Sequence, residues 1–327
     1  MLSHFPNQGA PLTEPQSNSE MTHPESGVLF GIAVYTMWGV FPIYFHSLEP
    51  SSALEILFQR ITWSVVFCAL VWLFVRDRRW IRQLLAVPHR LAVLTLAAYI
   101  LSVNWGLYIY AVSIEKIVET SLGYFINPLV LVVMGVVLLH ERLRTLQWVA
   151  VGLGAAAVLI IAIDYGRPPW IALGLAFSFA IYGYLKKRIG GHIGALESMT
   201  VETMVLVPVA IAGLAWIEFT GRGTFTTDAP WHGLLLMASG PLTAIPLICF
   251  AAAARRVPLA TMGMLQFIAP TLQLIVGVAI YGEDVPPMRW FGFSLVWIAL
   301  LLLTVDSVRS SMRRRRAQMP LAPRPAN

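Results

Sequence analysis

Two charged side chains, Arg60 and Glu202, lie several residues inside long apolar stretches of the sequence. Each is about six or seven residues from the start of its stretch, or roughly 10 Å along a helix at 1.5 Å per residue. A charge at that depth in a bilayer is costly unless it faces the protein interior, a cavity or a counter-charge. Two interpretations stay open: a structural ion pair or snorkelling side chain, or a contact with a substrate or gate. For Arg60 the expected counter-charge is Glu119.

Polar-tipped aromatic and amide side chains also lie within apolar stretches rather than at their ends. Such groups need hydrogen-bond partners, and a cavity lined by aromatic rings with a few polar groups supplies them. Helix packing explains any one of them, but as a set we expect them to line a substrate cavity. With the two charges, the expected cavity residues are Trp38, Arg60, Tyr99, Asn104, Trp105, Tyr108, Tyr124, Asn127, Tyr182, Glu202 and Gln266.

Pro128 and Pro270 lie in the middle of apolar stretches, and each is an expected helix break or hinge. A proline inside a helix removes a backbone hydrogen bond and kinks the helix, at about 3 kcal/mol in an ordinary interior. In a bilayer the freed carbonyl must find another donor or face a watery cavity. Asn127 and Gln266 lie within a turn or so of these prolines. A static bend is the alternative interpretation.

Smaller features have more ordinary explanations. Glu141 and Arg142 close an apolar stretch and are candidate residues of a cytoplasmic gate, although a helix end in water explains them too. Gly152 and Gly174, each followed four residues later by a small side chain, are expected at close helix contacts. Cys68 lies inside an apolar stretch, as does the second cysteine, Cys249, and packing is the expected role of both.

Enzyme chemistry finds no support in the sequence. It has no zinc-protease, paired-carboxylate or phosphate-binding glycine motif, and its five aspartates lie in connectors or at the ends of apolar stretches. No two of the seven histidines have metal-ligand spacing. We expect no enzyme activity, no metal and no cofactor. The net charge of +6 does not indicate nucleic-acid binding, because the arginines border apolar stretches.

The elements that must position these residues are membrane-spanning helices. The mean hydropathy is +0.70, and 57% of the 327 residues are hydrophobic against 12% charged, unlike a soluble domain. A bilayer core of about 30 Å needs roughly 20 apolar residues per helix. We expect an all-α integral membrane protein with ten transmembrane helices at 27–47, 53–75, 91–112, 119–139, 145–163, 169–186, 196–218, 231–252, 258–281 and 287–306.

The chain is one unit written twice. A constant shift of 142 positions repeats a set of unlike residues: Phe125, Pro128, Gly135, Glu141 and Trp148 recur as Phe267, Pro270, Gly277, Glu283 and Trp290. Each unit holds five spans, an odd number, so the second unit enters the membrane from the opposite side. We therefore predict two inverted five-helix repeats, 27–163 and 169–306, which is a frequent architecture of secondary transporters.

Connector charges predict the orientation. With the first tail in the cytoplasm, eighteen Lys and Arg residues lie on the inner side and four on the outer side. The positive-inside rule then places both termini in the cytoplasm. Residues 1–26, rich in Pro, Ser and Asn, are expected to form a disordered cytoplasmic tail without a cleaved signal peptide. The end, 307–327, is expected to be a basic cytoplasmic tail near anionic lipid.

With these features in view, the chain resembles the EamA-type drug/metabolite transporter superfamily, and within it the RarD proteins. The resemblance runs from Gly27 to about Asp306. It rests on the segment SLGYFINPLV at 121–130 and on Arg60-Ile-Thr-Trp-Ser64, Asn104-Trp105, Glu141-Arg142, Leu173-Gly-Leu-Ala-Phe-Ser-Phe-Ala180 and Glu202-Thr-Met. It implies ten transmembrane helices, residence in a bacterial-type inner membrane and movement of small organic molecules, outward by analogy.

The expected function is transport of a small, partly apolar metabolite or drug by alternating access of the two repeats. The solute is expected near the midplane, between spans 1–4 and 6–9, with the fourth and ninth spans packed together. The expected partners are a small-molecule substrate and the lipid bilayer, with no nucleic acid. The alternative is a membrane sensor or accessory subunit that keeps the fold without transporting. A passive channel is disfavoured, because no ring-forming filter sequence occurs. Glu202 is the one candidate for a proton site.

Overall fold

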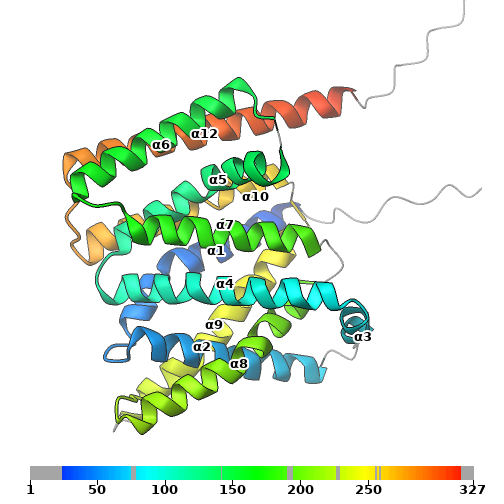
Figure 1. Cartoon of the computed structure of the whole chain (residues 1–327), viewed down its shortest axis with the longest axis vertical. Coiled ribbons are helices and arrows are strands. Elements are labelled where there is room, and N and C mark those ends of the chain that lie inside the picture. The colour runs from blue at the N-terminus through cyan, green and yellow to red at the C-terminus, as the bar shows by residue number, and fades with distance from the viewer. Residues whose placement is uncertain are drawn as a thin grey trace, which may run out of the picture.

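The computed structural model describes residues 24–74, 79–140, 142–189, 194–225, 229–254, 256–257 and 259–317. Every regular element in those ranges is a helix (Figure 1). The elements are α1 (Pro24–His46), α2 (Ala53–Phe74), α3 (Arg79–Leu85), α4 (Pro88–Ser113), α5 (Ile117–Leu139), α6 (Thr145–Tyr165), α7 (Trp170–Ile189), α8 (Ala195–Phe219), α9 (Pro230–Ala254), α10 (Leu259–Leu265), α11 (Ile268–Ile275), the π-helix η1 (Val276–Ile280) and α12 (Pro287–Ala317).

The prediction of an all-α membrane protein is confirmed. Nine helical segments of the described chain are long and apolar enough to cross a membrane. The sixth predicted span is a shorter apolar helix, Trp170–Lys186 within α7, so the count of ten stays a prediction. Large apolar side chains such as Phe74 and Phe219, each 87% exposed, cover the outside of the bundle. Such a surface suits a bilayer, because apolar side chains avoid water there and a helix satisfies its own backbone hydrogen bonds.

The helices follow the repeat register of the sequence. α2 and α8 begin at residues 53 and 195, α4 and α9 at 88 and 230, α5 and α10 at 117 and 259, and α6 and α12 at 145 and 287. Each of these pairs differs by 142 positions. α3 lies in the connector between α2 and α4, where no helix was expected.

The two repeats are interleaved rather than side by side. α6 packs on α12, α2 on α8, α5 on α7, and α1 on α9 and α11, and every one of these pairs joins one repeat to the other. Figure 1 shows α6 and α12 together as one flank of the bundle and α2 and α8 near the opposite flank. Two buried clusters follow from this packing, one around Ile56 and Leu236 and one around Phe125 and Phe293.

The repeats run in opposite directions. Glu283, just after η1, contacts the backbone of Ile117 and Val118 at the start of α5. By the repeat register, α5 is the counterpart of the segment from α10 to η1. The beginning of one therefore lies beside the end of the other, as inversion requires. We call this side of the bundle the Glu283 side. The first described turn of α1 and the end of α12 lie on the opposite side (Figure 1).

Only one of the two expected proline breaks is present. The ninth predicted span is interrupted at residues 266–267, one turn before Pro270, and ends as the π-helix η1. By contrast, α5 runs as a single helix through Pro128. Membrane helices often tolerate a proline in this way, because neighbouring groups satisfy the carbonyl that the proline leaves without a donor. α5 is therefore not broken at Pro128, and a hinge there stays a prediction. The fourth and ninth spans do pack together, since the Ser121 hydroxyl donates to the Pro270 carbonyl at 2.7 Å.

The predicted tails differ from the structure at their inner ends. Residues 24–26 already belong to α1, and α12 continues to Ala317, past the expected end of the span at residue 306. The rest of the two tails, 1–23 and 318–327, lies outside the described residues.

Candidate functional site

Arg60 lies on α2 and is 5% exposed. Its Nε donates to the Thr243 hydroxyl of α9 at 2.8 Å. The guanidinium carbon is 4.1 Å from the centre of the Trp105 ring and 5.5 Å from that of Phe45. Such stacking stabilises a guanidinium through the negative faces of the rings. The cation is therefore held by one hydroxyl and two aromatic faces.

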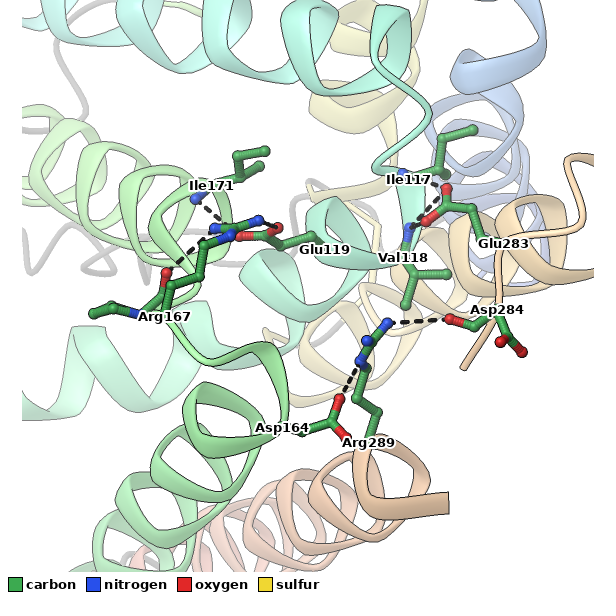
Figure 2. Close-up of polar contacts among 10 residues, drawn as sticks. Ile117, Val118, Glu119, Asp164, Arg167, Ile171, Glu283, Asp284 and Arg289 are labelled. Atoms are coloured by element: carbon green, nitrogen blue, oxygen red, sulfur yellow. Dashed lines mark hydrogen bonds and ion pairs between the residues drawn. The ribbon is translucent and has the colours of Figure 1, made fainter. Parts of the chain in front are cut away.

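Glu119 is not the partner of Arg60, and that expectation was wrong. Its carboxylate, at the start of α5, accepts from Nη2 of Arg167 at 3.2 Å and from the backbone N–H of Ile171 at 3.1 Å (Figure 2). Ile171 is in the first turn of α7, where unpaired N–H groups attract an anion. Among the ion pairs of the described residues, none includes Arg60.

A row of aromatic rings leads away from Arg60. Neighbouring ring centroids in the row are 5.9, 5.9, 6.1 and 6.0 Å apart. We call the five rings the aromatic row; they are Phe45, Tyr108, Tyr124, Phe179 and Tyr182. The row crosses from the first repeat to α7 of the second. Its Tyr108 hydroxyl is fully buried without a hydrogen-bond partner among the described residues.

Asn104 fixes the middle of the row. Its Nδ2 donates to the Leu175 carbonyl at 3.1 Å and to the Ser178 hydroxyl at 2.9 Å, and its Oδ1 accepts from the Tyr124 hydroxyl at 3.4 Å. The side chain is 1% exposed. A buried amide with its donor and acceptor both used holds its neighbours in one arrangement. Asn104 thus joins α4 to α5 and α7.

Glu202 lies at the far end of the row. Its Oε1 pairs with Nζ of Lys186 at 2.8 Å and accepts from the Ser198 hydroxyl at 2.8 Å. Its Oε2 accepts from the Tyr182 hydroxyl at 3.3 Å, and Lys186 also donates to Ser198. The structural ion pair, left open by the sequence, is therefore present at Glu202. The aromatic row thus has a deep charge at each end. Glu202 is compensated by a salt bridge, whereas Arg60 is stacked against aromatic rings.

A second polar group lies where α1 meets α11. Nε2 of Gln273 donates to the Trp38 carbonyl at 3.3 Å, and the Trp38 ring packs against Tyr35. Oε1 of Gln273 is buried without a partner among the described residues, as is Oδ1 of Asn127 on α5. Gln266 lies in the interruption before α11 and is half-buried.

Some expected site residues lie elsewhere. Tyr99 is 41% exposed on the outside of α4, so its expected place in the cavity was wrong. Arg142 is exposed between α5 and α6, and Glu141 lies outside the described residues. Gly152 has no neighbour within 4 Å of an added Cβ, so it marks no close helix contact, whereas an added Cβ at Gly174 would lie 2.5 Å from Leu107.

The Glu283 side is closed by polar contacts between the repeats. Glu283 accepts from the N–H of Ile117 at 2.5 Å and from that of Val118 at 3.1 Å (Figure 2). Burial raises the pKa of the Glu283 carboxyl above its ordinary 4.5, although these two N–H groups lower it. Ser51 of the first repeat binds Nε2 of His232 of the second at 2.8 Å.

Arg289 holds the first turn of α12 on the same side. Its Nε donates to Asp164 at 2.5 Å, and Nη1 donates to the Asp284 carbonyl at 3.1 Å (Figure 2). These bonds tie the end of α6 to the start of α12. No group of three or more His, Cys, Asp or Glu side chains suited to a metal ion occurs in the described ranges.

Sequence reasoning missed the partners of both deep charges. Lys186 follows Tyr182 by four residues, the spacing that puts two side chains on one helix face, so the pattern could have found it. Thr243 is 183 residues from Arg60 and is one of many hydroxyls in apolar stretches. Nothing in the sequence marks it.

Comparison with known proteins gives a consistent result. The EamA-like transporter family matches residues 25–163 and again 168–305. Protein RarD of Streptomyces exfoliatus is 51% identical over 91% of this chain and 93% of its own length. An uncharacterized transporter of Pseudomonas aeruginosa is 40% identical over 88% and 96%. The chloramphenicol-sensitive protein RarD of the same species is 32% identical over 89% and 97%.

A solved crystal structure has the same fold. It covers 86% of this chain and 99% of its own, with a TM-score of 0.55 and 16% identity.

Proposed function

This chain belongs to the EamA-like transporter family, and we propose that it exports small organic metabolites or drugs by alternating access of its two inverted repeats. The observation that carries the proposal is the aromatic row between Arg60 and Glu202. Its residues come from α1, α4 and α5 of the first repeat and α7 of the second. A binding site shared by two repeats can change its access when the repeats move against each other.

Membrane location and orientation complete the proposal. The chain lies in a bacterial-type inner membrane, with both termini in the cytoplasm and the Glu283 side outside. The support is the connector charge of eighteen inner against four outer Lys and Arg residues. The described ends of α1 and α12 lie on one side of the bundle, which agrees with an even number of spans (Figure 1).

The contacts at equivalent points of the repeats support an inward-facing conformation. On the Glu283 side Ser121 of α5 bonds to the Pro270 carbonyl, and an added Cβ at Gly277 would lie 3.0 Å from Val118. The repeat counterpart of Ser121 is Gly263 on α10. An added Cβ there meets no atom within 4 Å. Ser121 of the fourth span thus contacts the ninth span, whereas its counterpart Gly263 has open space beside it.

Flux through liposomes that contain the purified full chain tests the proposal. Chloramphenicol, amino acids and a broad metabolite mixture are loaded, and each solute is followed over time. We expect saturating flux of at least one solute, loss of that flux in Arg60→Ala, and unchanged flux in the control Tyr99→Phe. A non-saturating rate would indicate a channel. No flux for any solute, together with tight binding of a protein partner, would favour the sensor or accessory role.

A further inference from the structure

We propose that Arg60 binds a carboxylate of the transported solute, so that the substrates are small organic anions with an aromatic or apolar body. The inference rests on the proposed transport function and names its substrate class. A buried cation is costly unless an anion compensates it, and no carboxylate of the described residues forms an ion pair with Arg60.

None of the carboxylates of the described residues pairs with Arg60. Glu55 lies on the same helix, five residues before Arg60, about 7.5 Å along the helix axis. Its Oε1 accepts from the Thr224 N–H at 2.8 Å, and its Oε2 is buried without a partner among the described residues. Glu119 binds Arg167 and Ile171. Glu202, at the other end of the aromatic row, is neutralised by Lys186. The positive charge of Arg60 is therefore available to an anion from outside the protein.

The donors of Arg60 have the right geometry for a carboxylate. A guanidinium carries five N–H groups in a planar fork, and two parallel bonds to a carboxylate are its strongest arrangement. Nε is used by Thr243. The two terminal nitrogens have no hydrogen-bond partner among the described side chains and backbone. Thr243 therefore orients the guanidinium through Nε, while the two terminal nitrogens keep their N–H groups for a ligand.

The surroundings select the rest of the solute. Trp105 and Phe45 cover the guanidinium, and the rings of Tyr108 and Tyr124 continue the row from Phe45. Tyr44 donates to the Leu235 carbonyl and Tyr124 to Asn104, whereas the Tyr108 hydroxyl has no partner in the described chain. Tyr108, next to Phe45 in the row, thus has a spare donor for the solute, and the rings of the row suit an aromatic or apolar body.

The test compares phenylacetate with its neutral amide, phenylacetamide, in liposomes that contain the full wild-type chain. Loss of a charge-assisted pair weakens binding by about 10- to 100-fold, so we expect saturable phenylacetate flux with half-saturation at least about 10-fold below that of the amide. Equal half-saturation for the two compounds would overturn the proposal without any variant.

Variants locate the effect. Arg60→Lys keeps the charge but loses the fork, and Arg60→Gln loses both, so we expect a graded loss of phenylacetate flux. Tyr108→Phe removes the spare donor without leaving a hole and is expected to raise half-saturation several-fold for phenylacetate only. Tyr99→Phe is the control. Monodisperse elution and retained helical circular dichroism show that each variant is folded. Phenylacetate selectivity that survives in folded Arg60→Gln would overturn the proposal.

Failure of the substrate class differs from failure of the transport function. Saturable flux of a neutral solute such as chloramphenicol, with no flux and no competition by phenylacetate, would refute the anion site and leave the transporter intact. No saturable flux of any solute would refute both.

Discussion

At the scale of single residues, the two deep charges show two ways of keeping a charge inside a membrane. Glu202 is 4% exposed and has a lysine, a serine and a tyrosine as partners. Arg60 has a threonine and two ring faces. The Glu202 carboxylate has all its partners within the protein, so this group stabilises the fold without a ligand. Arg60 keeps an uncompensated charge and unused N–H donors, which suits a site that binds and releases a solute.

Lys186→Met should therefore lower stability, because it leaves the Glu202 carboxylate buried without a cation. Removing one partner of a fully buried pair costs about 3–5 kcal/mol. Since the Lys186 side chain is 30% exposed, we expect a smaller loss, about 2 kcal/mol. The double variant Lys186→Met/Glu202→Gln should recover most of it. Thermal unfolding of both purified variants checks this, and equal melting temperatures for the two would contradict the structural role of the pair.

At the scale of helices, the close approach of α2 and α9 positions Arg60 against Thr243. Gly240 is one turn before Thr243 on α9 and packs directly on the backbone of Trp63 and Ser64 in α2. A side chain at residue 240 would meet backbone atoms that cannot rotate away. The glycine thus fixes the distance between the two helices, and through it the place of the guanidinium.

Gly240→Ala should push α2 and α9 apart. Overpacking of this kind costs about 1–3 kcal/mol, and we expect a lower melting temperature together with weaker binding at Arg60. The matched control is Gly152→Ala, where an added methyl group meets no atom within 4 Å and alanine favours the helix by about 1 kcal/mol. The two substitutions should move the melting temperature in opposite directions. A Gly240→Ala protein as stable as wild type would show that the contact is dispensable.

At the scale of the whole molecule, alternating access requires the Glu283 side to open. Residues 118 and 277 lie on α5 and η1 in opposite repeats, and an added Cβ at Gly277 would be 3.0 Å from Val118. A disulfide between them, in a chain with Cys68 and Cys249 replaced by alanine, should hold this side closed. We expect flux to stop on oxidation and to return on reduction.

The matched control for that disulfide joins residues 161 and 292, where an added Cβ at Gly292 would be 2.5 Å from Ile161. This pair also links the two repeats, but it lies between α6 and α12 on the flank of the bundle (Figure 1). Oxidation of the control should leave flux unchanged. Full flux with the 118–277 disulfide closed would rule out opening at the Glu283 side.

The sequence predicted the fold better than the site. The lengths of the apolar stretches and the 142-residue repeat predicted where most helices begin, because both can be read directly from the order of residues along the chain. The register also carried Pro128 and Pro270 as equivalent breaks, yet only the span with Pro270 is interrupted. Side-chain contacts between residues far apart in the sequence could not be predicted. Glu119 was expected to pair with Arg60, but Thr243 and two aromatic rings contact Arg60 instead. Such pairings depend on packing between repeats, which the linear pattern does not encode.

The interleaving of the repeats has a consequence for how the protein is made. Because α1, α2, α5 and α6 each pack against helices of the second repeat, the first half of the chain has few partners of its own when it leaves the ribosome. Arg60 can meet Phe45 and Trp105 within the first repeat, but it meets Thr243 only after α9 has been inserted. We therefore expect a chain that ends after the first repeat to lack most of the helix packing of the whole protein.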